Sequence, residues 1–365
     1  MRENIPLTSI RGVAAIWVIF YHFGELHDTP PFLPNLGRHG WTAVDLFFVL
    51  SGFILMQVHP TFERARILPF LFKRAARVLP LHWAVMIALA VIAAAATAAH
   101  IPFNADGHYN WSTFPAAFLL VKWAVPGHGT WNGASWSLAV EMICYIAMPF
   151  FSPAITNAGS RSLTLAACVL TALMCAYNAL LLWTWAGHPA DAWITAPGVG
   201  RGVLAFPLGC VLARLAILQR DRIEPWAATM EAVGLAFMVA ASAIDAPYLI
   251  PAGAALLILG LSFESGPVAR ALYAKPLHWL GKVSFSIYLL HQTILLFLGK
   301  VMTPAHMPVP IALVAPVRAA VAIALVLVAS AATYRWIELP GQTIPRRIGV
   351  RVRARVADQV RLTAS

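Results

Sequence analysis

Long apolar segments separated by short polar ones run along the whole chain. A helix needs about 20 predominantly apolar residues to cross a bilayer core of about 30 Å. Ten segments come close to that length, and they are residues 7–24, 41–58, 81–99, 136–151, 163–185, 202–218, 227–244, 250–263, 280–299 and 311–334. Barrel strands would instead alternate over about 10 residues each. The pattern predicts an all-α, polytopic integral membrane protein with about ten transmembrane helices.

Two further segments have patterns of their own. Residues 114–125 are apolar but too short to span, and Pro126 and Gly127 follow them, which favours a re-entrant or interfacial segment. After a transmembrane domain over residues 1–345, the tail 346–365 repeats Ile or Val every four residues, with arginines on another face. We interpret the tail as a basic amphipathic helix on the anionic inner leaflet. A solvated or disordered tail is the alternative.

Composition agrees with a membrane protein, and charge predicts its orientation. The 365 residues are 60% hydrophobic and 11% charged, with a mean hydropathy of +0.72, whereas ordinary soluble domains are about 25% charged. With an even number of spans and a cytoplasmic N-terminus, 20 of the 26 Lys and Arg residues fall on the cytoplasmic side, as the positive-inside rule requires. The net charge of +11 therefore points to membrane lipids rather than nucleic acid, and both termini are predicted to be cytoplasmic.

Ionisable residues inside the apolar segments are the candidate functional groups. Asp45 would cost about 2.5 to 3.5 kcal/mol at mid-membrane, which marks a functional site by default. Arg11 and His22 lie eleven residues apart in the first span, about 16 Å along a helix, so they occupy opposite depths. Because successive spans alternate in direction, we expect Asp45, Glu141 and His291 to lie near the depth of His22, toward the outer face.

A second candidate site lies at the predicted cytoplasmic edge. Arg74 and Arg77 are three residues apart and can share a helix face, with Pro80 opening the third span as a first-turn proline. Guanidinium groups bind phosphate through two parallel hydrogen bonds, which favours a phosphorylated cytosolic ligand. Ordinary positive-inside anchoring is the alternative for this pair.

These segments together resemble the acyltransferase 3 family of membrane-bound O-acyltransferases. The resemblance covers essentially the whole chain and rests on five motifs in family order, which are RGVAAIWVIFYH, AVDLFFVLSGFIL, RAARVLPLHW, SWSLAVE and GKVSFSIYLLH. It implies a bacterial inner-membrane enzyme with an acyl-CoA donor, usually acetyl-CoA. It also implies a hydroxyl acceptor on a glycan or lipid-linked saccharide, such as an exopolysaccharide or O-antigen. The family's functional residues carry over to Arg11, His22, Asp45, Arg74, Arg77, Glu141 and His291.

The chemistry of these side chains agrees with that reaction. A sugar hydroxyl is a poor nucleophile, and a histidine is suited to remove its proton as it attacks a thioester. We therefore expect His22 to be the general base, with a carboxylate from Asp45 or Glu141 orienting it. Arg11, Arg74, Arg77 and His291 are expected to bind the donor. No spacing of His, Asp or Glu indicates a metal site.

Two other functions compete with direct transfer. The protein could carry the acyl group across the membrane to a separate periplasmic transferase, and a homodimer or such a partner is compatible with the sequence. Intramembrane Asp, Glu and His also serve proton-coupled secondary transporters. The sequence shows no repeat of matched halves of the kind common in those transporters.

Overall fold

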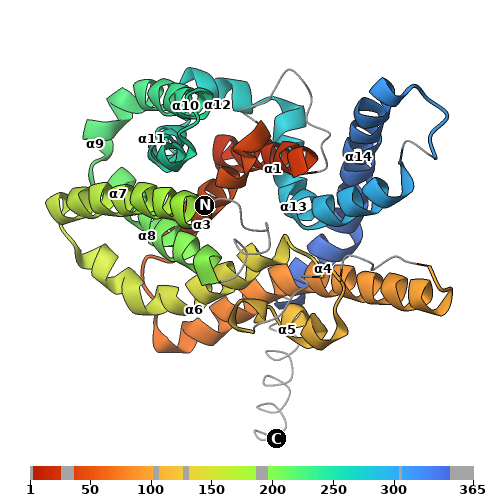
Figure 1. Cartoon of the computed structure of the whole chain (residues 1–365). Helices are drawn as coiled ribbons and strands as arrows, with labels where there is room; N and C mark the ends of the chain where they lie inside the picture. The colour runs from red at the N-terminus through yellow and green to blue at the C-terminus, as the bar shows by residue number, and fades with distance from the viewer. Residues whose placement is uncertain are drawn as a thin grey trace, which may run out of the picture.

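The computed structural model describes residues 3–25, 37–101, 107–125, 131–185, 196–303 and 306–345, and these ranges contain helices and no strand (Figure 1). The long helices are α1 (Ile5–Glu25), α3 (Ala43–Val58), α4 (Arg64–Ala98), α6 (Ser135–Asn157), α7 (Ser160–Trp185), α8 (Ala196–Leu218), α10 (Ala227–Ala243), α13 (Lys275–Val301) and α14 (Ile311–Thr333). The shorter ones are η1 (Gly40–Thr42), η2 (Trp111–Thr113), α5 (Phe114–Phe118), η3 (Lys122–Ala124), α9 (Arg220–Ile223), η5 (Glu224–Trp226), η6 (Pro247–Leu249), α11 (Ile250–Leu261), α12 (Pro267–Leu272) and the π-helical turn η7 (Tyr334–Glu338).

The predicted class of an all-α polytopic membrane protein is confirmed. In the part of the chain that the structure describes, nine helices are long and apolar enough to cross a membrane. The tenth predicted segment, residues 250–263, coincides with α11, whose 12 residues extend about 18 Å and fall short of a core of about 30 Å. Figure 1 shows α1 between the group formed by α10, α11 and α12 and the pair formed by α13 and α14.

Helix α4 is longer than the sequence pattern predicted. It begins at Arg64 and continues through Pro69 and Pro80 for 35 residues, or about 52 Å, so it extends beyond the bilayer core at one end. The prediction that Pro80 opens this helix is wrong. Gly341 lies close against the Pro80 ring and the Ala76 carbonyl oxygen, which is the oxygen left without its helical hydrogen bond because proline has no N–H.

The apolar segment at residues 114–125 forms only short helical turns, none long enough to span a membrane, and its re-entrant or interfacial placement stays a prediction. Its α5 lies beside α4 (Figure 1) and is held there by hydrogen bonds to carbonyl oxygens. His82 Nε2 lies 3.2 Å from the carbonyls of Ala117 and Phe118, and Trp83 Nε1 donates to the Phe118 carbonyl at 3.2 Å.

Small residues let two helix pairs approach closely. A side chain at Gly52 of α3 would overlap the Phe206 carbonyl of α8, and one at Gly209 of α8 would overlap the α3 backbone. Gly12 and Gly281 make the same kind of contact between α1 and α13. Such contacts are typical of helix packing in membranes, where close van der Waals contact replaces the hydrophobic driving force.

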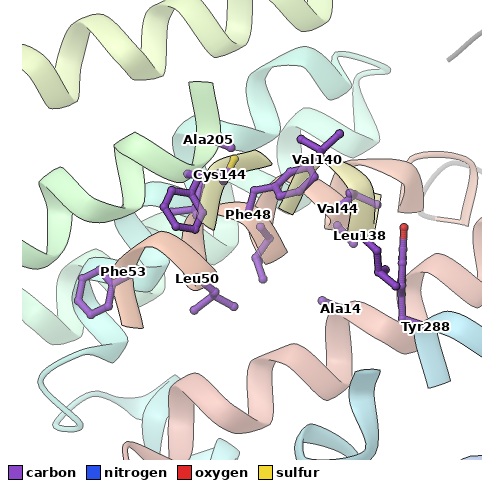
Figure 2. Packing of buried hydrophobic residues seen from close by; sticks show 14 of the residues in the cluster. Ala14, Val44, Phe48, Leu50, Phe53, Leu138, Val140, Cys144, Ala205 and Tyr288 are labelled. Carbon is purple, nitrogen blue, oxygen red and sulfur yellow. The ribbon is translucent and has the colours of Figure 1, made fainter. Parts of the chain in front are cut away.

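The apolar core lies where α1, α3, α6, α8 and α13 meet. Figure 2 shows one buried residue from each of these helices in a single cluster, namely Ala14, Phe48, Val140, Ala205 and Tyr288. The five helices therefore form one packed body, and they also carry most of the charged side chains described below. The basic tail predicted at residues 346–365 lies outside the described residues.

The predicted topology places the segment before α6 outside and the start of α4 in the cytoplasm. In a protein without its four native cysteines, Ser112→Cys should react with a membrane-impermeant thiol reagent on intact spheroplasts. Ala65→Cys, at the start of α4, should react only after permeabilisation. Both side chains lie at exposed positions, so access is decided by the side of the membrane. Labelling of Ala65→Cys in intact spheroplasts would contradict the predicted orientation.

Candidate active site

Two neighbouring cavities lie between the helices. Of the predicted site residues, His22 lines the first, and Arg11, Arg74, Arg77 and Glu141 line the second. The first, named here the His22 cavity, has a volume of about 500 Å³ and is lined among others by Tyr21, His22, Trp41, Trp136, Arg201, Tyr288 and Gln292. The second, named the arginine cavity, has a volume of about 90 Å³ and is lined among others by Arg11, Ser51, Arg74, Arg77, Glu141, Tyr145 and Tyr288. Helix α1 contributes Arg11 to one and His22 to the other.

The arginine cavity has the charge of an anion site. Arg74 and Arg77 of α4 share one helix face, as predicted, and Arg11 of α1 joins them. Three guanidinium groups thus line the cavity together with one carboxylate, that of Glu141. The Nε of Arg74 is buried and has no hydrogen-bond acceptor among the described residues. Guanidinium groups in this arrangement can hold phosphate oxygens.

Glu141 lies in the arginine cavity, whereas the sequence placed it at the depth of His22. Its carboxylate accepts hydrogen bonds from Ser51 Oγ at 2.8 Å and from the Tyr145 hydroxyl, and it interacts electrostatically with Arg11. Depth counting assumed that α6 begins at the membrane surface. The residues before α6 are in fact buried, and Asn132 donates to the Leu289 carbonyl at 3.0 Å, so the helix begins inside the protein.

Asp45 pairs with an arginine that the sequence had not singled out. Its carboxylate accepts from Arg201 Nε and from Asn178 Nδ2, each at 2.9 Å, and the Asp45 and Arg201 side chains are only 2% and 3% exposed. Asp45 was expected to orient His22, but these contacts engage it with Arg201 instead. Arg201 directly precedes the predicted span at residues 202–218, yet it lies inside α8.

The Arg201 guanidinium forms part of the wall of the His22 cavity. It lies over the Trp41 ring at 4.8 Å and over the Trp136 ring at 5.4 Å, and one of its terminal nitrogens donates to the Trp41 carbonyl at 2.9 Å. Contacts between a cation and an indole face are favourable, most of all away from water. Arg201 therefore fixes both tryptophans around the cavity.

His291 lies against His22 rather than with the arginines. The two ring centroids are 4.9 Å apart. His291 Nδ1 lies 2.6 Å from the Tyr288 carbonyl, and since a carbonyl only accepts, Nδ1 carries the hydrogen and Nε2 is an acceptor. That Nε2 is buried with no hydrogen-bond partner among the described residues. His291 was predicted to bind the donor, but its position next to His22 favours a role at the acceptor end.

Gln292 is a further polar group of the His22 cavity that the sequence did not indicate. Its Oε1 is buried and has no donor among the described residues. Gly133 packs against the Gln292 amide so closely that a larger residue would overlap it. The absence of a side chain at Gly133 therefore leaves room for the Gln292 amide beside the cavity.

His39 anchors the rim of the same cavity. Its Nε2 donates to Asp245 Oδ1 at 2.8 Å, and its Nδ1 lies 3.0 Å from Ser242 Oγ. Burial lowers the pKa of His39, while the carboxylate of Asp245 opposes that shift. In its neutral form the imidazole ties the start of η1 to the end of α10.

Glu338, at the end of the π-helical turn η7, is a third buried carboxylate near the arginines. It accepts from Ser286 Oγ at 3.0 Å and from Gln342 Nε2 at 3.1 Å, and it interacts electrostatically with Arg77 and Arg11. π-helical turns occur frequently at functional sites. The sequence signal that could have found Glu338 is a lone acid at the end of the last apolar span.

A thin wall separates the two cavities. Val44 and Tyr288 line both of them, and Ser137 Oγ donates to the Tyr288 hydroxyl at 2.9 Å. The described residues contain no group of three or more His, Cys, Asp or Glu side chains that could hold a metal ion. The site thus combines an arginine-rich chamber and a histidine-containing chamber on the two sides of one side-chain layer.

Comparison with known proteins finds a family match over most of the chain. A family model described as an acyltransferase domain matches residues 6–335, a range that includes every site residue predicted from the sequence. No solved structure matches the chain.

Three curated proteins show the extent of similarity. Acyltransferase MdmB of Streptomyces mycarofaciens is 27% identical over 312 residues, or 78% of this chain and 77% of that protein. Peptidoglycan O-acetyltransferase OatA of Listeria monocytogenes is 24% identical over 330 residues, or 80% of this chain and 50% of that protein. Protein 2 in picA locus of Rhizobium radiobacter is 38% identical over 93 residues, or 25% of this chain and 44% of that protein. The chain thus spans about half the length, or less, of the last two of these relatives.

The buried pair of Asp45 and Arg201 should contribute strongly to stability. Arg201→Met leaves a buried carboxylate without its cation, and removing one partner of a buried ion pair costs about 3–5 kcal/mol. We expect a large fall in the thermal unfolding temperature in detergent, partly recovered when Asp45→Asn is added. As a matched control, Arg220→Met breaks the exposed pair of Arg220 with Glu224, which is worth about 0.3–0.5 kcal/mol. Equal losses in both variants would contradict the prediction.

Proposed function

The chain belongs to the acyltransferase 3 family, and on that premise we propose that it transfers an acyl group, most simply acetyl, from cytosolic acyl-CoA to a hydroxyl of an exported or membrane-linked glycan. The observation that carries the proposal is the division of α1 between two chambers. Arg11 lines the arginine cavity, which suits a phosphorylated donor, and His22 lines a larger cavity with polar and aromatic walls. Val44 and Tyr288 lie between the two.

The donor end rests on the arginines. Coenzyme A carries phosphate groups, and Arg74 and Arg77 offer guanidinium forks on one face of α4. The buried Arg74 Nε, which has no acceptor among the described residues, fits a ligand oxygen. In the predicted topology this chamber lies toward the cytoplasm, where acyl-CoA is found.

The acceptor end rests on the walls of the His22 cavity. Trp41 and Trp136 present indole surfaces, on which the apolar face of a sugar ring can pack, and Gln292 lines the cavity with them. The cavity volume of about 500 Å³ lies within the range of small-molecule sites, about 300–1,000 Å³. A saccharide unit therefore fits the size and the polarity of this chamber.

The transfer needs one base and one leaving group. His22 takes the proton from the acceptor hydroxyl as its oxygen attacks the thioester carbonyl, the carbon–sulfur bond breaks, and the proton passes to the departing thiolate to give an ester and free coenzyme A. His291 packs against His22 and holds the orientation of that ring. Asp45 acts through Arg201, and Glu141 balances Arg11 in the donor chamber.

The relatives add support and keep one alternative open. OatA is named a peptidoglycan O-acetyltransferase, which favours an acetyl group and a glycan acceptor. The match covers only 50% of OatA, so that protein has a further part that this chain does not cover. In a second candidate function, the protein passes the acyl group across the membrane to a separate transferase. A proton-coupled transporter is disfavoured by the family.

His22→Ala should abolish transfer while leaving donor binding intact, because His22 lines the other cavity. Loss of a general base costs about 10² to 10⁴-fold in rate. Transfer of radiolabelled acetyl to cell-envelope glycan, measured beside acetyl-CoA binding, tests this. His306→Ala changes an exposed histidine that lines neither cavity and should leave transfer unchanged. Transfer above about a tenth of wild type in His22→Ala exceeds what this role allows and would exclude it.

Arg77→Ala should weaken donor binding. A hydrogen bond to a charged group contributes about 1.5 to 3 kcal/mol, so the Kd for acetyl-CoA should rise about ten- to a hundredfold. Arg66→Ala is the matched control on the same helix, since its side chain is 76% exposed and forms a surface ion pair with Glu63. If the purified Arg77→Ala protein is folded and binds acetyl-CoA as tightly as Arg66→Ala, the arginines serve as membrane anchors instead.

A further inference from the structure

Tyr288 forms the main part of the wall between the two cavities. It and Val44 are the residues that line both the arginine cavity and the His22 cavity, and they are only 7% and 5% exposed. Figure 2 shows the Tyr288 ring beside Leu138, with Val44 close by. Of these two side chains Tyr288 is much the larger, so its ring determines how wide the connection can be.

The Tyr288 ring is held by its hydroxyl and by a neighbouring ring, and the backbone carbonyl of Tyr288 is hydrogen-bonded as well. Its hydroxyl accepts from Ser137 Oγ at 2.9 Å, and its backbone carbonyl accepts from His291 Nδ1 at 2.6 Å. The Phe47 ring packs edge-on against it at 5.7 Å. A buried ring with this number of contacts keeps one orientation, since interiors are close-packed and rotation would need its neighbours to move.

The Tyr288 ring is connected to the predicted base, His22, through the ring of His291. The Tyr288 ring lies 5.7 Å from the His291 ring, which lies 4.9 Å from the His22 ring. If the donor binds in the arginine cavity and the acceptor hydroxyl meets His22, as in the proposed function on which this inference rests, the acyl group has to pass Tyr288. An acyl group that passes Tyr288 reaches His22 in the other cavity.

We propose that the ring of Tyr288 determines the width of the acyl group that the protein transfers. Acetyl, with one methyl group beyond the carbonyl, passes between the Tyr288 ring and Val44. Acyl groups branched or aromatic next to the carbonyl, such as isobutyryl and benzoyl, are wider at the same distance from the sulfur and are rejected. Tyr288 is thus a specificity-determining residue, and it separates the two chambers when no acyl group lies between them.

The test compares donors of different width in the purified, membrane-reconstituted protein. Acetyl-CoA, isobutyryl-CoA and benzoyl-CoA are supplied with envelope glycan, and kcat/KM is measured for wild type, Tyr288→Phe and Tyr288→Ala. A single methylene in a fitted apolar site changes selectivity about 10- to 200-fold. Tyr288→Ala should raise the isobutyryl-to-acetyl ratio of kcat/KM by at least tenfold, and the benzoyl-to-acetyl ratio likewise. Tyr288→Phe keeps the ring and should keep both ratios within about threefold of wild type.

Two controls separate width selection from general damage. Phe297→Ala removes an aromatic side chain from the same helix, α13, at a position 47% exposed, and should leave the ratios unchanged. Ser137→Ala removes the partner of the Tyr288 hydroxyl and should match Tyr288→Phe, with no further change in the double variant, since both remove the same hydrogen bond. A ratio is insensitive to the fraction of folded protein, so a partly unfolded variant still reports on selectivity.

The outcomes distinguish this inference from the proposed function. If the wild-type protein transfers acetyl from acetyl-CoA and Tyr288→Ala leaves both donor ratios unchanged, Tyr288 does not select the acyl group by its width. The proposed function would still stand in that case. Equal kcat/KM values of the wild-type protein for benzoyl-CoA and acetyl-CoA would also exclude selection by width. If the wild-type protein transfers no acyl group from any of the three acyl-CoA donors, the proposed function is wrong, and the role of Tyr288 that rests on it is wrong as well.

Discussion

The buried ion pair between Asp45 and Arg201 is the interaction on which the shape of the His22 cavity depends. Each charge alone would be costly among apolar helices, so α3 and α8 must pack where the two groups meet. Gly52 and Gly209 allow that approach because neither backbone meets a side chain. The pair then sets the position of Trp41 through the bond from Arg201 to its carbonyl. A cavity wall, a helix crossing and a buried charge are thus determined together.

Much of the fold could be predicted from the sequence because its causes are local. A bilayer accepts only long apolar helices, so segment length and positive charge gave the class directly, and Arg74 and Arg77 share a face because of helix geometry alone. Contacts between segments that lie far apart in the sequence could be predicted less well. Depth counting assigned Glu141 to His22 because it could not show that α6 begins among buried residues. Pro80 was misassigned because tertiary packing overrides local preference.

In the candidate site, too, local features could be predicted and contacts between distant segments could not. Arg11 and His22 were recognisable as an ionisable pair on one helix, and the structure places them in two adjoining chambers. Arg201 was not recognisable because it precedes the apolar run of its span, and Gln292 because a single amide at a helix position carries no periodic signal. Both became evident only through their partners, Asp45 and Gly133. Residues that act through a neighbour leave little trace in a sequence pattern.

The distribution of carboxylates among the arginines explains which part of the protein is prepared for an anion. Asp45 is bonded to Arg201, Glu141 interacts electrostatically with Arg11 and Arg74, and Glu338 interacts with Arg77 and Arg11. Among the described residues of the arginine cavity, Arg74 is the one whose buried Nε has no acceptor. A buried donor without a partner costs about 1–3 kcal/mol, and a phosphate oxygen would remove that cost. In the proposed function a donor phosphate would supply that acceptor, on the side of the Tyr288 wall away from His22.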